Sequence, residues 1–85
     1  MKEEIKELFP EIEEIKNKSL RAQVVSAWEE AVKRGGWQID ELKTIPFTLL
    51  IPNCKIDLIT HTRAVTQTAI KVATVLSESY KDQVE

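Results

Sequence analysis

The sequence predicts an all-α fold, a small bundle of three to four helices that ends in a long C-terminal helix. Three observations lead to this prediction. The 85 residues include only two Gly and three Pro, 42% of them are hydrophobic, and apolar side chains recur at three- and four-residue steps. A domain this small buries only about 60% of the surface that its unfolded chain exposes. We therefore expect one helical domain over residues 1–85, with a thin margin of stability.

Residues 1–18 form a charged amphipathic segment with a single apolar stripe. Pro10 interrupts this segment, and proline suits a first helical turn but not a helix interior. We therefore expect a short helix before Pro10 and a second short turn that starts near it. The Glu and Lys side chains around the stripe are expected to be solvated. The apolar stripe consists of Ile5, Leu8, Phe9, Ile12 and Ile15.

Residues 19–34 are predicted to form a second helix. Ser19 is the expected N-cap, and Gly35 and Gly36 can supply the left-handed conformation that commonly ends a helix. Trp28 is expected to be a core anchor rather than a ligand-stacking residue, because of the area that a buried Trp covers. The expected buried stripe is Leu20, Val24, Ala27, Trp28 and Ala31. Two i,i+4 ion pairs are expected, Glu29 with Lys33 and Glu30 with Arg34.

Residues 45–56 are predicted to be an ordered, buried connector. Their first part is strongly apolar and is bracketed by Pro46 and Pro52, so it cannot be a regular helix throughout and is too apolar for a solvent loop. A short turn that Asp40 caps is expected just before the connector. Trp37, like Trp28, is expected to be a core anchor.

Residues 57–80 are predicted to form one long helix that Asp57 caps. Its polar face is narrow, and at about 100° per residue the apolar side chains cover roughly two thirds of the circumference. Such a helix needs partners on most sides. We therefore expect either another copy of the chain to cover it or the missing C-terminal part of a larger domain. The predicted polar face holds Thr60, Arg63, Gln67, Lys71, Thr74 and Glu78.

Composition excludes several classes of protein. The formal charge of -2 gives no basic face for nucleic acid. The charged N-terminus does not resemble a signal peptide, and no apolar run approaches the length of a transmembrane span. With a single cysteine, Cys54, a reducing compartment is the natural setting. We expect a cytoplasmic protein with neither a nucleic-acid nor a membrane partner.

His61 is the single histidine of the chain and falls within the apolar arc of the long helix, near its edge. One interpretation is a hydrogen-bonded core residue; the other is a metal ligand that awaits partners, because ligation needs several converging donors. Arg63, a conceivable phosphate contact, is expected to be a solvated charge on the polar face. Asn53 and Cys54 are interpreted as a turn residue and a buried thiol, and no catalytic residue is assigned.

The stretch from Leu58 to Thr66, Leu-Ile-Thr-His-Thr-Arg-Ala-Val-Thr, resembles the first metal-binding helix of HD-domain metal-dependent phosphohydrolases, as do the apolar positions that follow it. Residues 28–52, including Ile-Pro-Phe-Thr-Leu-Leu, are similar to the lead-in of archaeal HD-domain proteins. The resemblance covers the opening portion of such a domain. The apolar positions that follow are Ala69, Val72, Ala73 and Leu76.

This resemblance implies that His61 is the first ligand of a divalent metal. The family's adjacent His-Asp pair and final Asp are absent, so no tightly bound metal and no phosphohydrolase activity are expected of this chain alone. The leading hypothesis is the N-terminal part of an HD-type metal-dependent phosphohydrolase, truncated and inactive by itself. The alternative is a free-standing helical interaction module that self-associates through its C-terminal helix as a homo-oligomer.

Overall fold

The structure, a computed structural model, describes residues 1–81. The described part of the chain contains only helices, turns and one isolated β-bridge between Pro46 and Asp57, so the all-α prediction is confirmed. None of the helices within this part is both long and apolar enough to cross a membrane. In chain order the elements are α1 (Lys2–Leu8), the 3-10 helix η1 (Pro10–Glu14), α2 (Lys18–Gly35), the 3-10 helix η2 (Ile39–Thr44) and α3 (Leu58–Ser79).

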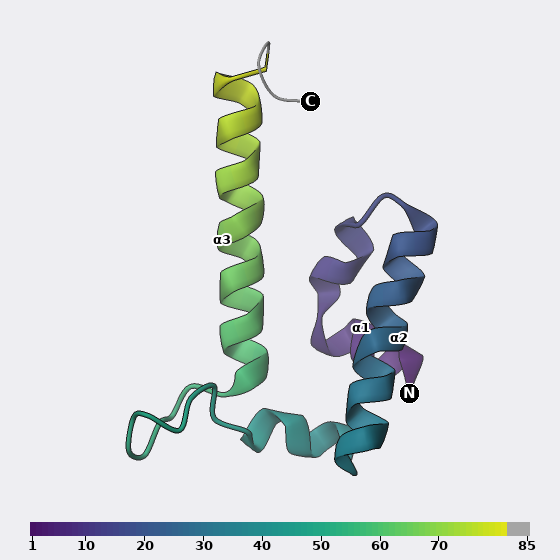
Figure 1. Ribbon diagram of the computed structural model, residues 1–85, viewed down its shortest axis with the longest axis vertical. Coiled ribbons are helices and arrows are strands. Elements are labelled where there is room, and N and C mark those ends of the chain that lie inside the picture. Colours follow the sequence, from purple (N-terminus) through teal and green to yellow (C-terminus); the bar gives the residue numbers. More distant parts are fainter. Residues whose placement is uncertain (82–85) are drawn as a thin grey trace.

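The helices are arranged as a small body and one helix that stands beside it. α1, η1 and α2 pack together as the body, η2 crosses from the body to the start of α3, and α3 rises alongside with most of its length apart from the body (Figure 1). The radius of gyration is 15.4 Å, whereas a compact domain of this length has about 12 Å. The fold is therefore open on the side of α3.

Within residues 1–81, one hydrophobic core joins the body, η2 and the first turn of α3. Ile5 is fully buried, and the ring of Phe9 stacks on that of Trp28 with centroids 4.3 Å apart. α3 contributes one buried residue among those described, Ile59. The core thus fixes the start of α3 and leaves its later turns without cover. The core residues are Ile5, Phe9, Ile12, Val25, Val32, Leu42 and Ile59.

The interruption predicted at Pro10 is confirmed. α1 ends at Leu8, and Pro10 occupies the first position of η1, where its missing N–H costs no hydrogen bond. The turn between the two elements lets Ile5, Phe9 and Ile12 all reach the core. The predicted stripe therefore bends with the chain and stays on one buried side.

The start and the buried face of α2 differ from the prediction. Asn17 rather than Ser19 is the N-cap, because its Oδ1 accepts a hydrogen bond from the Leu20 amide at 2.9 Å, and Ser19 lies inside the helix. The buried residues are Val25 and Val32, two turns apart. The helix is rotated so that these valines, which have more apolar surface than alanine, meet the core. Of the predicted stripe, Val24 and Trp28 are partly buried, whereas Leu20, Ala27 and Ala31 are exposed.

The end of α2 follows the prediction. Gly36 has a φ of 70° and caps the helix in the left-handed region, where glycine has no Cβ penalty. The guanidinium of Arg34 donates to Glu30 at 2.8 Å, so one of the two predicted ion pairs forms. Among residues 1–81, no ion pair is found between Glu29 and Lys33.

The predicted cap of η2 is wrong by two residues. Gln38 precedes η2, and its main-chain N–H donates to the Glu41 carboxylate at 2.7 Å, as in a capping box. Asp40 lies within the first turn instead. Trp37 is 42% exposed, so it is not the core anchor that was expected. The core is filled at this point by Leu42.

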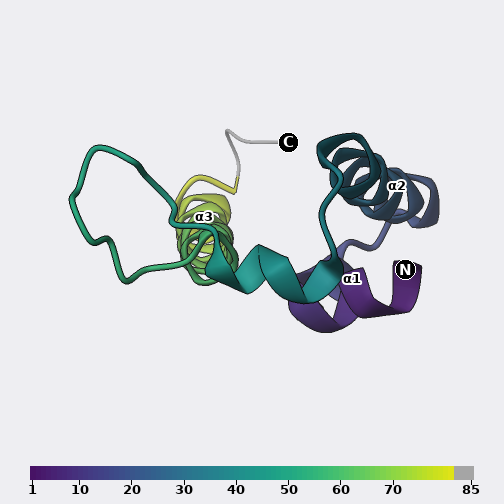
Figure 2. The same cartoon turned by 90° about the horizontal axis from the view of Figure 1, so that it is seen from below.

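Residues 45–57 form an arm that is partly buried at its base and exposed at its tip, rather than a buried connector. The Phe47 amide donates to the Ile56 carbonyl at 3.0 Å, and the Leu58 amide donates to the Ile45 carbonyl at 2.7 Å. These bonds pair the two ends of the arm. At the tip, Leu49 is 90% and Leu50 is 92% exposed. The prediction of burial is wrong because the body is too small to cover the arm, which projects on the side of α3 away from the body (Figure 2).

The predicted cap of α3 is confirmed. The Oδ1 of Asp57 accepts a hydrogen bond from the Thr60 amide at 2.8 Å, and its Oδ2 accepts one from the Thr60 hydroxyl, also at 2.8 Å. These two bonds from Thr60 hold the pKa of the Asp57 carboxyl below its usual range. The helix that follows is not enclosed. From residue 67 to residue 81 every side chain is exposed.

Candidate functional site

α3 has two apolar faces on opposite sides. One faces the body and includes Ile59, Thr62 and Thr66, which are buried or partly buried. The other faces away from the body. At about 100° per residue, the residues directly opposite the body form a line that we call the outer stripe. The outer stripe consists of His61, Val65, Thr68, Val72 and Val75.

His61 lies at the start of the outer stripe, where α3 meets the arm. Its imidazole stacks on the ring of Phe47 with centroids 4.3 Å apart and an interplanar angle of 19°. The side chain is partly exposed, at one end of a shallow hollow that Ala64, Val65 and Thr68 help to line. His61 is therefore a positioned and accessible imidazole and not a residue of the hydrophobic core. It lies on the outer face of α3.

The structure brings no complete set of metal donors to His61. Within residues 1–81, no group of three or more His, Cys, Asp or Glu side chains is placed to hold a metal ion. The nearby Asp57 carboxylate is occupied by the amide and hydroxyl of Thr60. The residues of the described chain thus provide one candidate ligand and do not by themselves fit a metal ion, which requires several donors.

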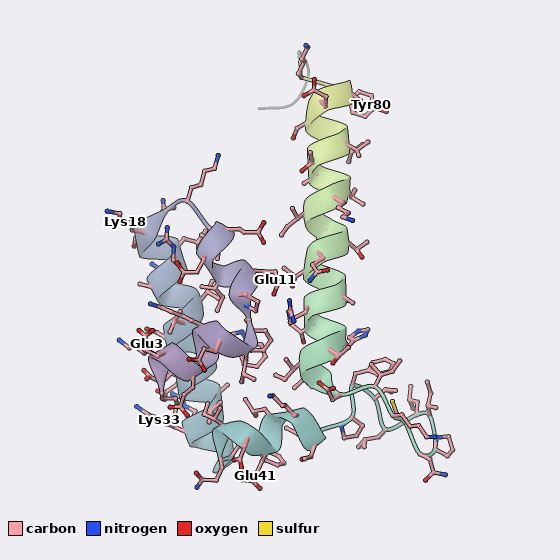
Figure 3. All side chains as sticks on the ribbon, turned by 180° about the vertical axis from the view of Figure 1, so that it is seen from behind. Glu3, Glu11, Lys18, Lys33, Glu41 and Tyr80 are labelled. Atoms are coloured by element: carbon pink, nitrogen blue, oxygen red, sulfur yellow. The ribbon has the colours of Figure 1, made fainter. Side chains whose placement is uncertain are left out.

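A partly buried carboxylate links η1 to α3. The Glu11 side chain is 10% exposed and points from η1 toward α3 (Figure 3). The guanidinium of Arg63 donates to this carboxylate from Nε at 3.0 and 3.1 Å and from Nη2 at 3.0 Å. The side-chain amide of Gln67 also donates to it, at 2.9 Å. The hydrogen bonds from Arg63, and then that from Gln67, lower the pKa of Glu11 from 4.5 to about 2.

The Arg63 side chain is 40% exposed, as expected for the polar face, but its guanidinium is also paired with Glu11. Arg63 and Gln67 belong to the predicted polar face of α3, yet both donate hydrogen bonds to Glu11 of the body. Glu11 was not singled out in the sequence, because it sits in a charged run and its partners follow 52 and 56 residues later. A pairing between such distant residues leaves no local pattern in a single sequence.

Acid should weaken the contact between η1 and α3. The pKa of Glu11 is about 2 in the folded chain and 4.5 without its partners. Its contribution to stability is therefore fully present above pH 4.5 and is lost as the pH falls through 4.5 toward 2. We expect Glu11→Gln to destabilise the chain at pH 7, and most of its difference from the wild type to disappear by pH 2. Urea unfolding followed by circular dichroism over this pH range measures the difference.

Glu13→Gln is the matched control for this prediction. Glu13 is 57% exposed and lies 3.9 Å from the Arg21 guanidinium, and an exposed pair of this kind contributes little. Its substitution should change the urea midpoint only slightly at every pH. A difference between the wild type and Glu11→Gln that stays constant from pH 7 to pH 2 would contradict the role of Glu11.

A groove separates the body from the middle of α3. Its volume is about 380 Å³ and its lining is mostly apolar, with the Glu11 and Glu14 side chains at its edge. Thr62 and Thr66 also line the groove, but no histidine or cysteine among residues 1–81 lines it to act as a base or thiol nucleophile, so the lining forms no catalytic arrangement. The apolar residues that line the groove are Phe9, Ile12, Ile15, Val24, Trp28 and Ile70.

Asn53 and Cys54 lie in the arm and carry no catalytic arrangement either. Asn53 has a φ of 56°, which asparagine adopts more readily than most residues, so it is a turn residue as predicted. The Cys54 thiol is partly exposed rather than buried, and it donates to the Ile56 carbonyl at 3.5 Å.

Comparisons of the chain with protein-family models, with curated proteins and with solved structures find no match. What the chain does is therefore inferred from α3, its histidine and the arm.

Proposed function

We propose that the chain is the N-terminal part of an HD-type metal-dependent phosphohydrolase, with His61 as the first metal ligand. The position of His61 carries this proposal. The imidazole lies in the first turns of the long helix, on the face turned away from the body, at the start of an uncovered apolar stripe. Helices that packed on this stripe would bring further ligands next to His61. The resemblance of residues 58–66 to the first metal-binding helix of the family supports the same assignment.

In this proposal His61 and Phe47 have separate roles. An imidazole nitrogen of His61 would hold the metal together with the family's other ligands, and the stacked ring of Phe47 restricts the orientation of the imidazole. A metal held there would supply Lewis-acid chemistry to a phosphoryl oxygen and to a bound water. Without the family's His-Asp pair and final Asp, we propose that the chain alone is inactive. A cytoplasmic location is also proposed, because the lone Cys54 suits a reducing compartment.

The parent gene provides the first test. The codons that follow Glu85 should encode an adjacent His-Asp pair within about one helix. The absence of such a pair there would contradict the proposal. In a protein that contains the pair, His61→Ala should weaken Mn²⁺ binding by more than about 100-fold and abolish hydrolysis of p-nitrophenyl phosphate.

Thr68→Ala is the control for this substitution, because Thr68 lies two turns along the same face and carries no metal-binding group. It should leave Mn²⁺ affinity and hydrolysis unchanged. The 85-residue chain alone should retain no Mn²⁺ through gel filtration. Stoichiometric metal in the eluted peak would contradict the assignment of His61 as a ligand without partners.

A second candidate function is a protein-protein interaction module, and the exposure of apolar side chains favours it. Val65, Val72 and Val75 on α3 and Leu49 and Leu50 on the arm are all more than half exposed. An extended exposed apolar surface commonly marks an interaction site. Light scattering at several protein concentrations tests this candidate, because a chain that stays monomeric would contradict self-association.

A further inference from the structure

We infer that a basic hollow between α1 and the start of α2 binds a small anion that carries two or three linked phosphate groups. The hollow has a volume of about 370 Å³, and its lining residues belong to α1 and α2. Lys18 lies at the edge of the body away from α3, whereas Glu11 lies on the side toward it (Figure 3). The inference goes beyond both candidate functions and rests on neither. The lining residues are Lys2, Lys6, Lys18, Arg21, Ala22 and Val25.

The fold sorts the cations of a mixed-charge segment onto one side. Lys2 and Lys6 alternate with acidic residues in the sequence, but a four-residue step places both on the same face of α1. Lys18 and Arg21 are neighbours in the same way on the first turns of α2. All four line the hollow, and no acidic side chain of the described chain does so. Because like charges at these spacings repel, an anion between them would stabilise the arrangement.

Nearby carboxylates compensate this positive charge only weakly. The Nζ of Lys6 lies 3.7 Å from Glu3, and the Nη1 of Arg21 lies 3.9 Å from Glu13. The two glutamate side chains are 85% and 57% exposed, and exposed pairs of this kind contribute little. The hollow therefore keeps positive charge that a bound anion can neutralise.

Arg21 is held in a fixed orientation at the hollow. Its Nε donates to the Ile15 carbonyl at 2.9 Å, and the side chain is 28% exposed. This bond leaves the terminal nitrogens of the guanidinium to donate to a ligand. A planar guanidinium matches two oxygens of a phosphate group, and lysine side chains add point charges that suit phosphate.

The charge and the size of the hollow indicate the class of ligand. Within residues 1–81, Lys2 and Lys18 form no ion pair, so they can bind ligand oxygens without losing a partner. Four cations match a multiply charged phosphate compound better than a single carboxylate. Val25, which is 3% exposed, closes the hollow with an apolar floor. Nucleic acid would instead require a more extended basic face.

Isothermal titration calorimetry of the full 85-residue chain with sodium tripolyphosphate tests the inference, at about 0.15 M salt so that distant exposed charges are screened. A saturable site is expected. Lys2→Gln and Lys18→Gln should each weaken binding by about 10-fold, because each removes a charge-assisted hydrogen bond. Both side chains belong to exposed residues, so both variants should remain folded, which circular dichroism checks.

Lys71→Gln is the matched control, because it removes the same charge from an exposed position on α3. It should leave the affinity unchanged within about twofold, since screening limits its effect at a distance. In NMR spectra, tripolyphosphate should shift the amide signals of residues 2–6 and 18–25 and not those of α3. Equal weakening by all three substitutions, or the lack of saturable binding, would overturn the inference.

A lipid headgroup offers the same phosphate chemistry as a soluble compound. Sedimentation with phosphatidylcholine vesicles, with and without phosphatidylinositol bisphosphate, separates the two sources. Co-sedimentation that Lys18→Gln weakens would assign the hollow to a headgroup, and tripolyphosphate binding without co-sedimentation would assign it to a soluble phosphate. A single-stranded oligonucleotide that binds more tightly than tripolyphosphate would overturn the assignment to a small anion. These outcomes are independent of the His-Asp pair in the parent gene and of self-association.

Discussion

Replacing Ile5 with alanine is expected to lower the free energy of unfolding by about 3–5 kcal/mol. Ile5 is 0% exposed and belongs to the hydrophobic core. Truncation of a fully buried isoleucine removes apolar burial and leaves a cavity that the surroundings fill only in part. A small domain has a total stability of about 5–15 kcal/mol, and this chain is small and open. The variant should therefore be close to unfolded at room temperature.

Urea unfolding followed by far-UV circular dichroism measures this effect, with all proteins at one concentration, since association adds to apparent stability. Leu20→Ala and Leu50→Ala are the matched controls, because these leucines are 50% and 92% exposed. Each control should cost less than about 1 kcal/mol. An Ile5→Ala protein as stable as the controls would show that the core is not organised around α1.

Truncation of Ile59 to alanine is expected to cost about 2–4 kcal/mol and to loosen α3 from the body. Ile59 is 6% exposed and is the residue through which α3 enters the core. Without it, the hydrogen bonds that link α3 to the body are those from Arg63 and Gln67 to Glu11, and the Leu58 amide still donates to the Ile45 carbonyl at the end of η2. The size of the effect follows from the lost burial and the cavity.

Two measurements separate loss of stability from loss of attachment. Urea unfolding gives the first, and small-angle X-ray scattering under native conditions gives the second, as an increase of the radius of gyration relative to the wild type. Ile70→Ala is the control, since Ile70 is on the same side of α3 but is 38% exposed. Equal effects of the two substitutions would mean that α3 is held along its length and not at its first turn.

The outcome at the arm shows how a correct physical premise can give a wrong structure. Residues 45–56 are apolar, and apolar segments are normally buried. Burial also requires a surface to pack against, and the apolar side chains of the body pack in its own core. The arm is instead ordered by main-chain bonds at its base, while Leu49 and Leu50 stay exposed. Whether an apolar segment is covered depends on what else is present to cover it.

The pairing of Glu11 with Arg63 and Gln67 shows the complementary case. The polar side of α3 was expected to face solvent because it carries Arg63 and Gln67. These two residues instead bind the Glu11 carboxylate, which is 10% exposed. Four hydrogen bonds to this carboxylate offset the cost of removing it from water. The result is that α3 turns a polar edge as well as Ile59 to the body and presents its outer stripe away from it.

Local features of the sequence by themselves determined the helices, the break at Pro10, the left-handed cap at Gly36 and the cap of α3 at Asp57. Each of these depends on residues within a turn or two, so a single sequence contains the necessary information. The sequence also placed His61 near the start of the long helix. The direction in which that helix faces was decided by tertiary contacts between residues more than 50 positions apart. For that reason only the structure shows that the outer stripe, which begins at His61, faces away from the body and is uncovered.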